Sequence, residues 1–368
     1  MIAYNRTWLA HREILQDAEE ALHQQCITVE EFETIKTQHP VGFYTLGTFP
    51  RLGLYLLTWL VAWCCVGLML MLLFYSNVFG GVFITVAVLL IAALEYFIAR
   101  KFHFKTGVDD ALCHAAILFL VMGADDVFRL SVLQSGWTVF MVAFVFTIRY
   151  LNGVSAVATF LSAMFVFYTF LENTPLHVYT PLLLCSISLL VFGVFQRISK
   201  APHYYEGLFT VIKVVALIFS HGVISYSLIF SNPVHHRSNF VLHCIELILC
   251  VLLPLGFILL GFKQRNKVLF RSGLVLILLT CYVFMSLSAF EQYGVWISLI
   301  GLAGIFFAWY LIKYFKNPYK GHIAFAEENE HYEYSKSVIN DEQYPDIKNP
   351  PTGFGGGSFG GGGASGSF

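Results

Sequence analysis

The chain has 368 residues, of which 57% are hydrophobic, 17% aromatic and only 12% charged. A water-soluble protein could not bury so much apolar surface, and an intrinsically disordered chain has the opposite bias, so the composition excludes both classes. It predicts a polytopic membrane protein. The net charge of −1 is unevenly distributed, because residues 53–312 carry +4 whereas residues 1–52 carry −3 and residues 313–368 carry −2.

Residues 1–50 predict a small helical hairpin. Apolar residues recur every seven positions from Trp8 to Leu22, and Thr28 and Glu31 have the spacing of a capping box that begins a second helix. No short apolar run follows a basic start here, so we expect no cleavable signal peptide. The favoured interpretation is a solvated pair of helices that docks on the membrane domain, and the alternative is a partner-binding or regulatory element.

Residues 51–316 predict a transmembrane domain of ten helices. A helix needs about 20 apolar residues to cross the hydrocarbon core. The ten apolar segments are 54–75, 78–99, 109–124, 137–150, 154–172, 177–196, 207–230, 239–262, 268–289 and 294–315. The third and fourth are the weakest because both are short and the stretch between them, 124–129, is charged. If neither crossed the membrane, the number of spans would be eight.

The charges in the connecting loops predict the orientation of this domain. Cytoplasmic loops are enriched in Lys and Arg. With the N-terminus inside, ten basic residues fall in the inner loops: Arg100, Lys101, Lys105, Arg149, Arg197, Lys200, Lys263, Arg265, Lys267 and Arg271. Only Arg129 and Arg237 fall in the outer loops. This alternation predicts that both termini are cytoplasmic.

Four ionisable residues inside predicted spans are the candidate functional site. Lys213 and His221 share a face of the span 207–230, and His243 and Glu246 are adjacent on the span 239–262. These neighbouring helices are antiparallel, so His221 and Glu246 could approach each other and relay protons or bind a cation. In the alternative interpretation, Lys213 extends to the membrane surface and the histidine only bonds a neighbouring helix.

Other polar residues give weaker signals. Asp109 and Asp110 are interpreted as helix-start residues stabilised by the helix dipole, and Glu95 and His114 are weaker intramembrane candidates. Outer-side groups have no metal-ligand spacing and are interpreted as solvated; they are Asp125, Asp126, Glu172, His177, His235, His236 and Glu291. The eight cysteines form no CxxC, and neither HExxH nor GxSxG occurs. We therefore expect no metal, no cofactor, no disulfide and no nucleic-acid partner, and an enzyme is not favoured.

The C-terminal region changes character twice. Residues 317–352 form an acidic, tyrosine-rich segment, and residues 353–368 contain nine glycines, which predicts a disordered tail. Phe354, Phe359 and Phe368 are placed more regularly than a plain linker needs. They are candidates for docking a partner, and the alternative is an ordinary disordered tail.

Two resemblances follow from these segments. The ending Gly-Gly-Gly-Gly-Ala-Ser-Gly-Ser-Phe (360–368) resembles the cytoplasmic tails of bacterial TPM-domain membrane proteins, although the TPM domain itself is absent. The acidic first helix, the segment Ile27-Thr-Val-Glu-Glu-Phe-Glu-Thr-Ile35, Pro40 and the following spans resemble uncharacterised bacterial polytopic membrane proteins of the DUF2157-like type. Both resemblances imply a bacterial inner membrane, and neither implies a known chemistry.

Two classes of function are compatible with these observations. The first is a membrane scaffold or regulatory subunit that recruits a protein partner through its cytoplasmic ends. The second is a transporter or channel-like protein for a small solute or lipid, with Lys213, His221, His243 and Glu246 in its polar path. No internal repeat supports an inverted-repeat transporter, and the sequence leaves the oligomeric state open.

Overall fold

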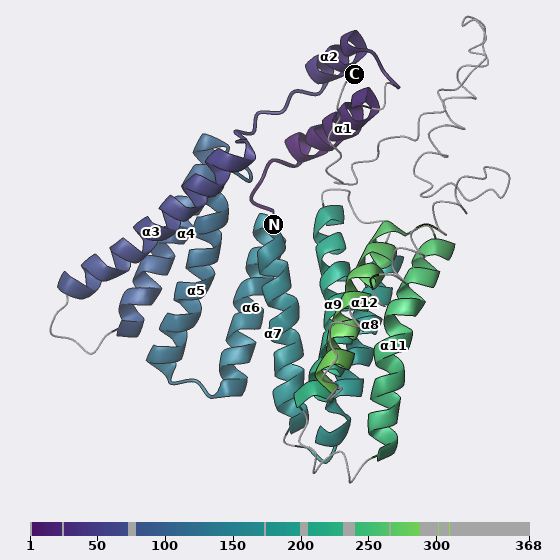
Figure 1. Cartoon of the computed structure of the whole chain (residues 1–368). Coiled ribbons are helices and arrows are strands. Elements are labelled where there is room, and N and C mark those ends of the chain that lie inside the picture. Colours follow the sequence, from purple (N-terminus) through teal and green to yellow (C-terminus); the bar gives the residue numbers. More distant parts are fainter. Residues whose placement is uncertain are drawn as a thin grey trace, which may run out of the picture. The chain divides into compact units, whose positions relative to one another are not determined.

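A computed structural model describes residues 2–23, 26–72, 79–172, 174–198, 205–230, 240–264 and 266–287, together with 301 and 309. Within these residues the fold is all helical, and the only strand-like pairing among them is a single bridge between Tyr44 and His103. The chain divides into two compact units, Met1–Leu299 and Ile300–Phe368. Nearly all described residues belong to the first unit (Figure 1).

Two short helices precede the membrane domain. α1 runs over Arg6–His23 and α2 over Val29–Gln38. The predicted capping box is confirmed: the Thr28 hydroxyl accepts the Glu31 amide at 3.2 Å, and the Glu31 carboxylate accepts the Thr28 amide at 2.7 Å. His11 of α1 bonds the carbonyl of Pro40 at 3.0 Å, so the chain after α2 returns alongside α1.

Nine of the described helices are long and apolar enough to cross a membrane. They are α3 (Thr48–Leu72), α4 (Phe79–Lys101), α5 (Val108–Phe128), α6 (Val132–Tyr150), α7 (Gly153–Glu172), α8 (Thr180–Arg197, after the 3₁₀ turn η1 at His177–Tyr179), α9 (Glu206–Phe230), α11 (Phe240–Lys263) and α12 (Lys267–Leu287). They correspond to the first nine predicted spans, and the polytopic helical bundle is confirmed. The tenth predicted span, 294–315, lies outside the described residues apart from positions 301 and 309.

The third and fourth predicted spans, which the sequence marked as weak, are both complete helices. α5 has 21 residues and α6 has 19, and both are long and apolar enough to cross a membrane, so the structure does not support the alternative with eight spans. α5 continues through the charged stretch and ends where Arg129 takes a left-handed conformation with φ 47°. Its carboxylates have partners there, since Asp126 accepts the Gly80 amide at 2.7 Å and Asp125 accepts the Ser135 hydroxyl at 2.5 Å.

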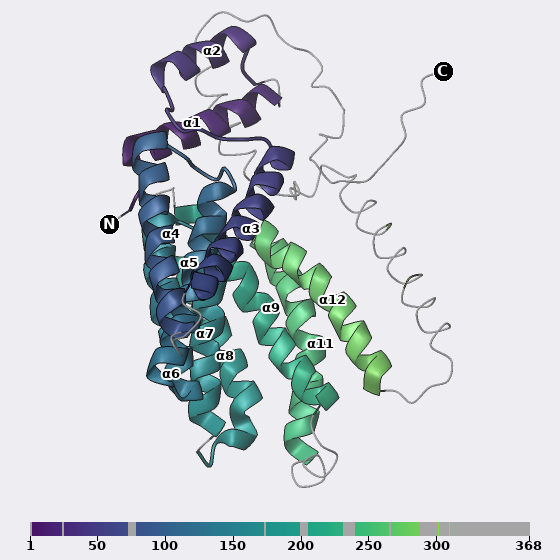
Figure 2. The ribbon, with the colours of Figure 1, turned by 90° about the vertical axis from the view of Figure 1, so that its left-hand side faces the viewer.

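The spanning helices pack in two groups joined by the contact of α7 with α8 and α9. In the first group α5 contacts α3, α4 and α6, and α6 contacts α7; in the second, α9 contacts α8, α11 and α12, and α11 contacts α12. Figure 2 shows α4 and α5 side by side. A Cβ on Gly80 or Gly123 would meet the carbonyl of the other at 2.8 Å, so these glycines permit the close approach of α4 and α5.

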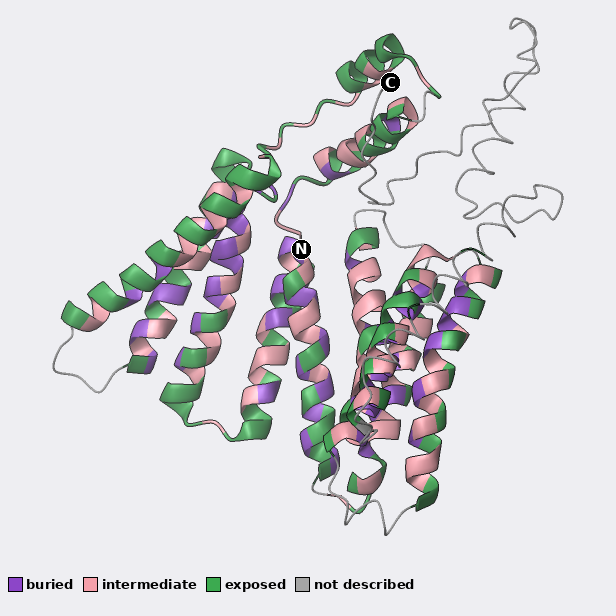
Figure 3. Ribbon diagram, in the orientation of Figure 1, coloured by how far each residue is buried: buried purple, intermediate pink, exposed green. Residues whose placement is uncertain are grey.

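Burial is uneven among the spans. Most of α3 is exposed, whereas buried residues line α5 and α7 (Figure 3). We call the end of the first group at which α3 begins, α4 ends and α5 begins the hairpin side, because α1 and α2 attach there. Since successive spans are antiparallel, α7, α9 and α12 also begin on this side.

Candidate functional site

The N-terminal segment is attached directly to the hairpin side of the membrane helices. The Ala3 amide donates to the carbonyl of Arg149, the penultimate residue of α6, at 2.9 Å. The Tyr4 hydroxyl donates to Asp109, in the first turn of α5, at 3.5 Å, and the Tyr4 side chain is buried. Two neighbouring residues therefore fix the start of α1 to the ends of two different spans.

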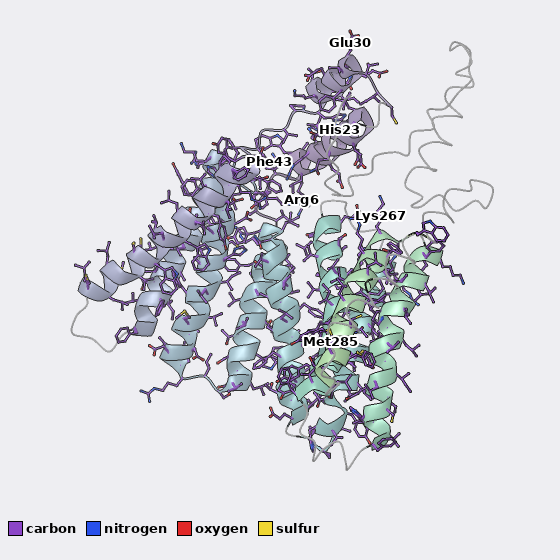
Figure 4. All side chains as sticks on the ribbon, viewed as in Figure 1. Arg6, His23, Glu30, Phe43, Lys267 and Met285 are labelled. Carbon is purple, nitrogen blue, oxygen red and sulfur yellow. The ribbon has the colours of Figure 1, made fainter. Side chains whose placement is uncertain are left out.

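An aromatic junction surrounds this attachment. We use this name for Tyr4, Trp8, Phe43, Phe102 and Phe104, which come from the N-terminal segment, α1, the α2–α3 linker and the α4–α5 loop. Tyr4 meets Phe104 edge to face with centroids 4.9 Å apart, and Trp8 meets Phe102 in the same way at 5.1 Å. Figure 4 labels Phe43, which stacks on Phe104 at 4.8 Å. Edge-to-face and stacked rings add stability beyond the area they bury.

The α2–α3 linker is held by its backbone as well. The Tyr44 amide donates to the Phe102 carbonyl at 2.9 Å, and the Phe104 amide donates to the Tyr44 carbonyl at 3.3 Å. Gly42 lies against the ring of Trp8, where a Cβ would come within 2.5 Å of a ring carbon. The hairpin is thus attached at both of its ends. A groove of about 270 Å³ lies beside the attachment, between the N-terminal segment and the end of α4.

Asp109 organises the tight loop before α5. Its side chain is 2% exposed and accepts three local hydrogen bonds, from the amides of Lys105 at 2.7 Å and Thr106 at 2.8 Å and from the Thr106 hydroxyl at 2.9 Å. Lys105 and Gly107 have positive φ angles of 52° and 91°. Asp109 is a helix-start residue, as predicted, and it also receives Tyr4 from a position 105 residues earlier in the chain.

Asp110 belongs to a hydrogen-bonded chain that crosses three helices. It accepts from Arg51 of α3 at 2.6 Å and from the amide group of Asn152, which precedes α7, at 3.0 Å. Asn152 in turn bonds His114 Nε2 at 3.0 Å, and His114 Nδ1 bonds the Tyr55 hydroxyl at 3.1 Å. The Asn152 oxygen can only accept, so a neutral His114 carries its proton on Nε2 and accepts from Tyr55.

A second ion pair joins α4 to α6 on the hairpin side. Glu95 accepts from Arg149 at 2.6 Å and from the Tyr150 hydroxyl at 2.5 Å. Glu95 and His114 were weak candidates from sequence, and the structure gives both of them specific partners. Sequence reasoning does not single out four of the residues in these contacts as site residues: Tyr4, Arg51, Tyr55 and Asn152. The sequence could have indicated Asn152 as the N-cap of α7, because its side chain accepts the amide of Ser155, three residues later, at 3.1 Å.

Charges on the hairpin side affect the attachment. Burial, followed by the carboxylates of Asp109 and Asp110, raises the pKa of the Tyr4 phenol well above its usual value, so Tyr4 stays a hydrogen-bond donor. Burial, followed by the charge of Arg51, lowers the pKa of Arg12. The Arg12 guanidinium lies 4.5 Å from the centre of the Phe104 ring. α1 is therefore anchored by one buried phenol and by one cation resting on the aromatic junction.

His221, the central residue of the predicted polar path, is fully buried among α9, α11 and α12. Its Nε2 lies 3.1 Å from the Cys250 carbonyl and 2.9 Å from the Thr280 hydroxyl, and the Ser225 hydroxyl lies 3.0 Å from its Nδ1. Thr280 donates to the Leu276 carbonyl at 2.9 Å, so its oxygen is available to accept from Nε2. One neutral tautomer therefore satisfies both ring nitrogens, which is the arrangement of a structural core histidine.

The other residues of the predicted path are more dispersed. Glu246 is 4% exposed and accepts from the Ser227 hydroxyl at 3.1 and 3.2 Å. Among the described contacts, none joins Glu246 to His221, because the antiparallel register sets Glu246 opposite Ser227 and Cys250 opposite His221. Lys213 and His243 are both half-buried.

No group of three metal-ligating side chains occurs within the part of the chain that the structure describes. Phe354, Phe359 and Phe368 lie outside the described residues, so their docking role stays a prediction.

The fold defines a multi-pass integral membrane protein whose spanning helices contact the lipid bilayer. Comparison with protein-family models, with curated proteins and with solved structures gave no match to this chain.

Proposed function

We propose that the protein is a membrane scaffold or regulatory subunit that presents its N-terminal hairpin to a protein partner. The observation that carries this proposal is the attachment of Ala3 to Arg149 and of Tyr4 to Asp109. A hairpin held at its base keeps one orientation relative to the membrane. Such preorganisation lowers the entropy lost when a partner binds.

The exposed surface of the hairpin suits a partner with both apolar and basic groups. α2 has no buried residue, and Val29 and Ile14 are 65% and 40% exposed. Glu30, Glu31 and Glu33 lie beside Val29. Hydrogen bonds from Thr28 lower the pKa of Glu31, which keeps this carboxylate ionised. An apolar residue among carboxylates favours a mixed protein surface over the anionic surface of a membrane.

The orientation and location are part of the same proposal. The excess of Lys and Arg in alternate loops supports cytoplasmic termini, and the two resemblances support a bacterial inner membrane. The tail, through Phe354, Phe359 and Phe368, is proposed as a second recruiting element on the same side. The support for the orientation, for the location and for the role of the tail comes from the sequence.

Photo-crosslinking tests the proposed recruitment by the hairpin. A benzoylphenylalanine at Val29 of the full-length protein in its native membrane is expected to form a discrete protein adduct, because this side chain is exposed on the hairpin. The matched control is the same group at Tyr96, which is 55% exposed in the span α4. Lipid adducts alone are expected at Tyr96, and lipid adducts or none at Val29 would contradict the proposal.

A transporter is the second candidate function, and the burial of Glu246 favours it. A carboxylate inside a span is costly unless it serves a purpose or is protonated, so it is a functional candidate by default. On α11, Glu246 lies one helical turn before Cys250, and the carbonyl of Cys250 is the group opposite His221 of α9. A proton-coupled path between α9 and α11 would use these two groups.

Proton flux into liposomes distinguishes the two candidates. A transporter using this path predicts that the reconstituted wild type dissipates a pH gradient, that Glu246→Gln abolishes the flux, and that Ser227→Ala, which keeps the carboxylate, retains it. The scaffold predicts that none of the three exceeds protein-free liposomes. Because His221 is fully satisfied in a neutral form, we expect the second result.

A further inference from the structure

A groove between α9 and α12 has a different polarity at its two ends. It has a volume of about 240 Å³ and is lined by Thr210, Val214, Ile218, Lys267, Arg271 and Val275, among others. α9 and α12 begin on the same side and run parallel, and the bond between His221 and Thr280 sets their register. Lys267 and Thr210 therefore lie near the hairpin-side ends of their helices, and Ile218 and Val275 lie about 12 Å farther along them.

This order of side chains matches the order of groups in a phospholipid. Lys267 is at the first position of α12, where Figure 4 labels it, and Arg271 follows one turn later on the same helix. Hydroxyls of Thr210 and Ser272 accompany these cations, and only aliphatic side chains line the deeper part. Val275 and Ile218 are 56% and 41% exposed, so the deep end is open toward the acyl chains of the bilayer.

The chemistry of the two cations favours a phosphate over a simple aliphatic occupant. The amides at the start of α12 do not supply the attraction, because the Asn266 side chain already accepts from Val268 at 3.0 Å and Leu269 at 3.3 Å. The groups that would attract a phosphate are the Lys267 ammonium and the Arg271 guanidinium, and Arg pairs well with phosphate oxygens. Basic pockets between spanning helices are a recurring way to hold anionic headgroups.

We propose that the groove between α9 and α12 binds one anionic phospholipid, with its phosphate between Lys267 and Arg271 and an acyl chain along Val214, Val275 and Ile218. The site is separate from the hairpin and is independent of the proposed scaffold function. A lipid bound there fills the groove between α9 and α12 and covers the exposed side chains of Ile218 and Val275.

Thermal stabilisation by added lipid tests this site in the full-length, detergent-purified protein. Palmitoyl-oleoyl phosphatidylglycerol is expected to raise the melting temperature more than the corresponding phosphatidylcholine. The double variant Lys267→Gln/Arg271→Gln should raise the half-saturating phosphatidylglycerol concentration on the order of tenfold or more, because it removes two charge-assisted contacts. The matched control is Arg100→Gln/Lys101→Gln, which removes two exposed cations from the end of α4 and should leave the titration unchanged.

A second variant separates the lipid from a free anion and does not alter charge. Val275→Trp fills the aliphatic part of the groove and should abolish the preference for phosphatidylglycerol. Equal stabilisation by the two lipids, an equal effect of the control pair, or an unaltered titration of either groove variant would overturn the proposal. Stabilisation by inorganic phosphate as large as that by phosphatidylglycerol would overturn it too, because a free anion would then suffice.

Discussion

Gly107→Ala is expected to prevent accumulation of the folded protein. Gly107 has φ 91°, which side-chain-bearing residues rarely adopt, and a Cβ there would overlap the carbonyl oxygen of Arg51 in α3. The neighbour is backbone, so it cannot rotate away. Strain at such a position together with overlap in a packed site should cost more than about 3 kcal/mol. The same loop carries Lys105 and Thr106, so the damage extends to the attachment of Tyr4.

Gly67→Ala is the matched control. Gly67 lies within α3, and beyond its chain neighbours and the adjacent backbone of this helix no atom lies within 4 Å of the position that a Cβ would take. Alanine is favoured over glycine in a helix by up to about 1 kcal/mol, so this variant should fold normally. Yield and melting temperature, measured by fluorescence-detected size-exclusion chromatography, compare the two. A Gly107→Ala protein that melts with the wild type would show that the loop does not have the described conformation.

The spans could be predicted from sequence because their cause is local. Length and hydropathy decide whether a helix can cross the bilayer, and nine of the ten predicted spans match described helices. In the sequence, the third and fourth spans are the weakest because both apolar segments are short and residues 124–129 between them are charged. The structure gives the carboxylates of Asp125 and Asp126 partners near the end of α5, Ser135 and Gly80, so the helix continues through them.

The attachment of the hairpin could not be predicted, because its contacts join distant residues. Tyr4 and Asp109 are 105 positions apart, and Arg51 and Asp110 are 59 apart. In the sequence, Asp109 and Asp110 have the pattern of any helix start. For the predicted polar path, the sequence places His221 and Glu246 within apolar segments. It does not reveal the register of α9 and α11, which depends on packing and gives the two residues separate hydrogen-bond partners.

Asp109→Ala is the second prediction with a large effect. The variant leaves two backbone amides and the hydroxyls of Thr106 and Tyr4 without their acceptor at a site that is 2% exposed. Leaving buried donors unsatisfied costs roughly 1–3 kcal/mol each, so we expect a loss of about 3–5 kcal/mol and release of the N-terminal segment. Tyr4→Phe, which loses only the 3.5 Å hydrogen bond, should cost less than about 1 kcal/mol.

Asp125→Ala is the control for this variant on the same helix. Asp125 is exposed near the other end of α5 and accepts one hydroxyl, from Ser135 at 2.5 Å. Its loss should cost no more than about 1 kcal/mol and should leave the hairpin attached. A melting temperature lowered equally by Asp109→Ala and Asp125→Ala would contradict the special role of Asp109.

Hydrogen–deuterium exchange of the N-terminal segment tests the central claim, that the hairpin is held on the membrane domain, most directly. In the wild type, the Ala3 amide and the first turns of α1 should exchange slowly, because Ala3 donates to Arg149 and Tyr4 is buried. Asp109→Ala should accelerate exchange over residues 2–23 and leave α11 and α12 unchanged. Exchange of residues 2–5 in the wild type at the rate of a free peptide, or exchange that Asp109→Ala does not alter, would contradict it.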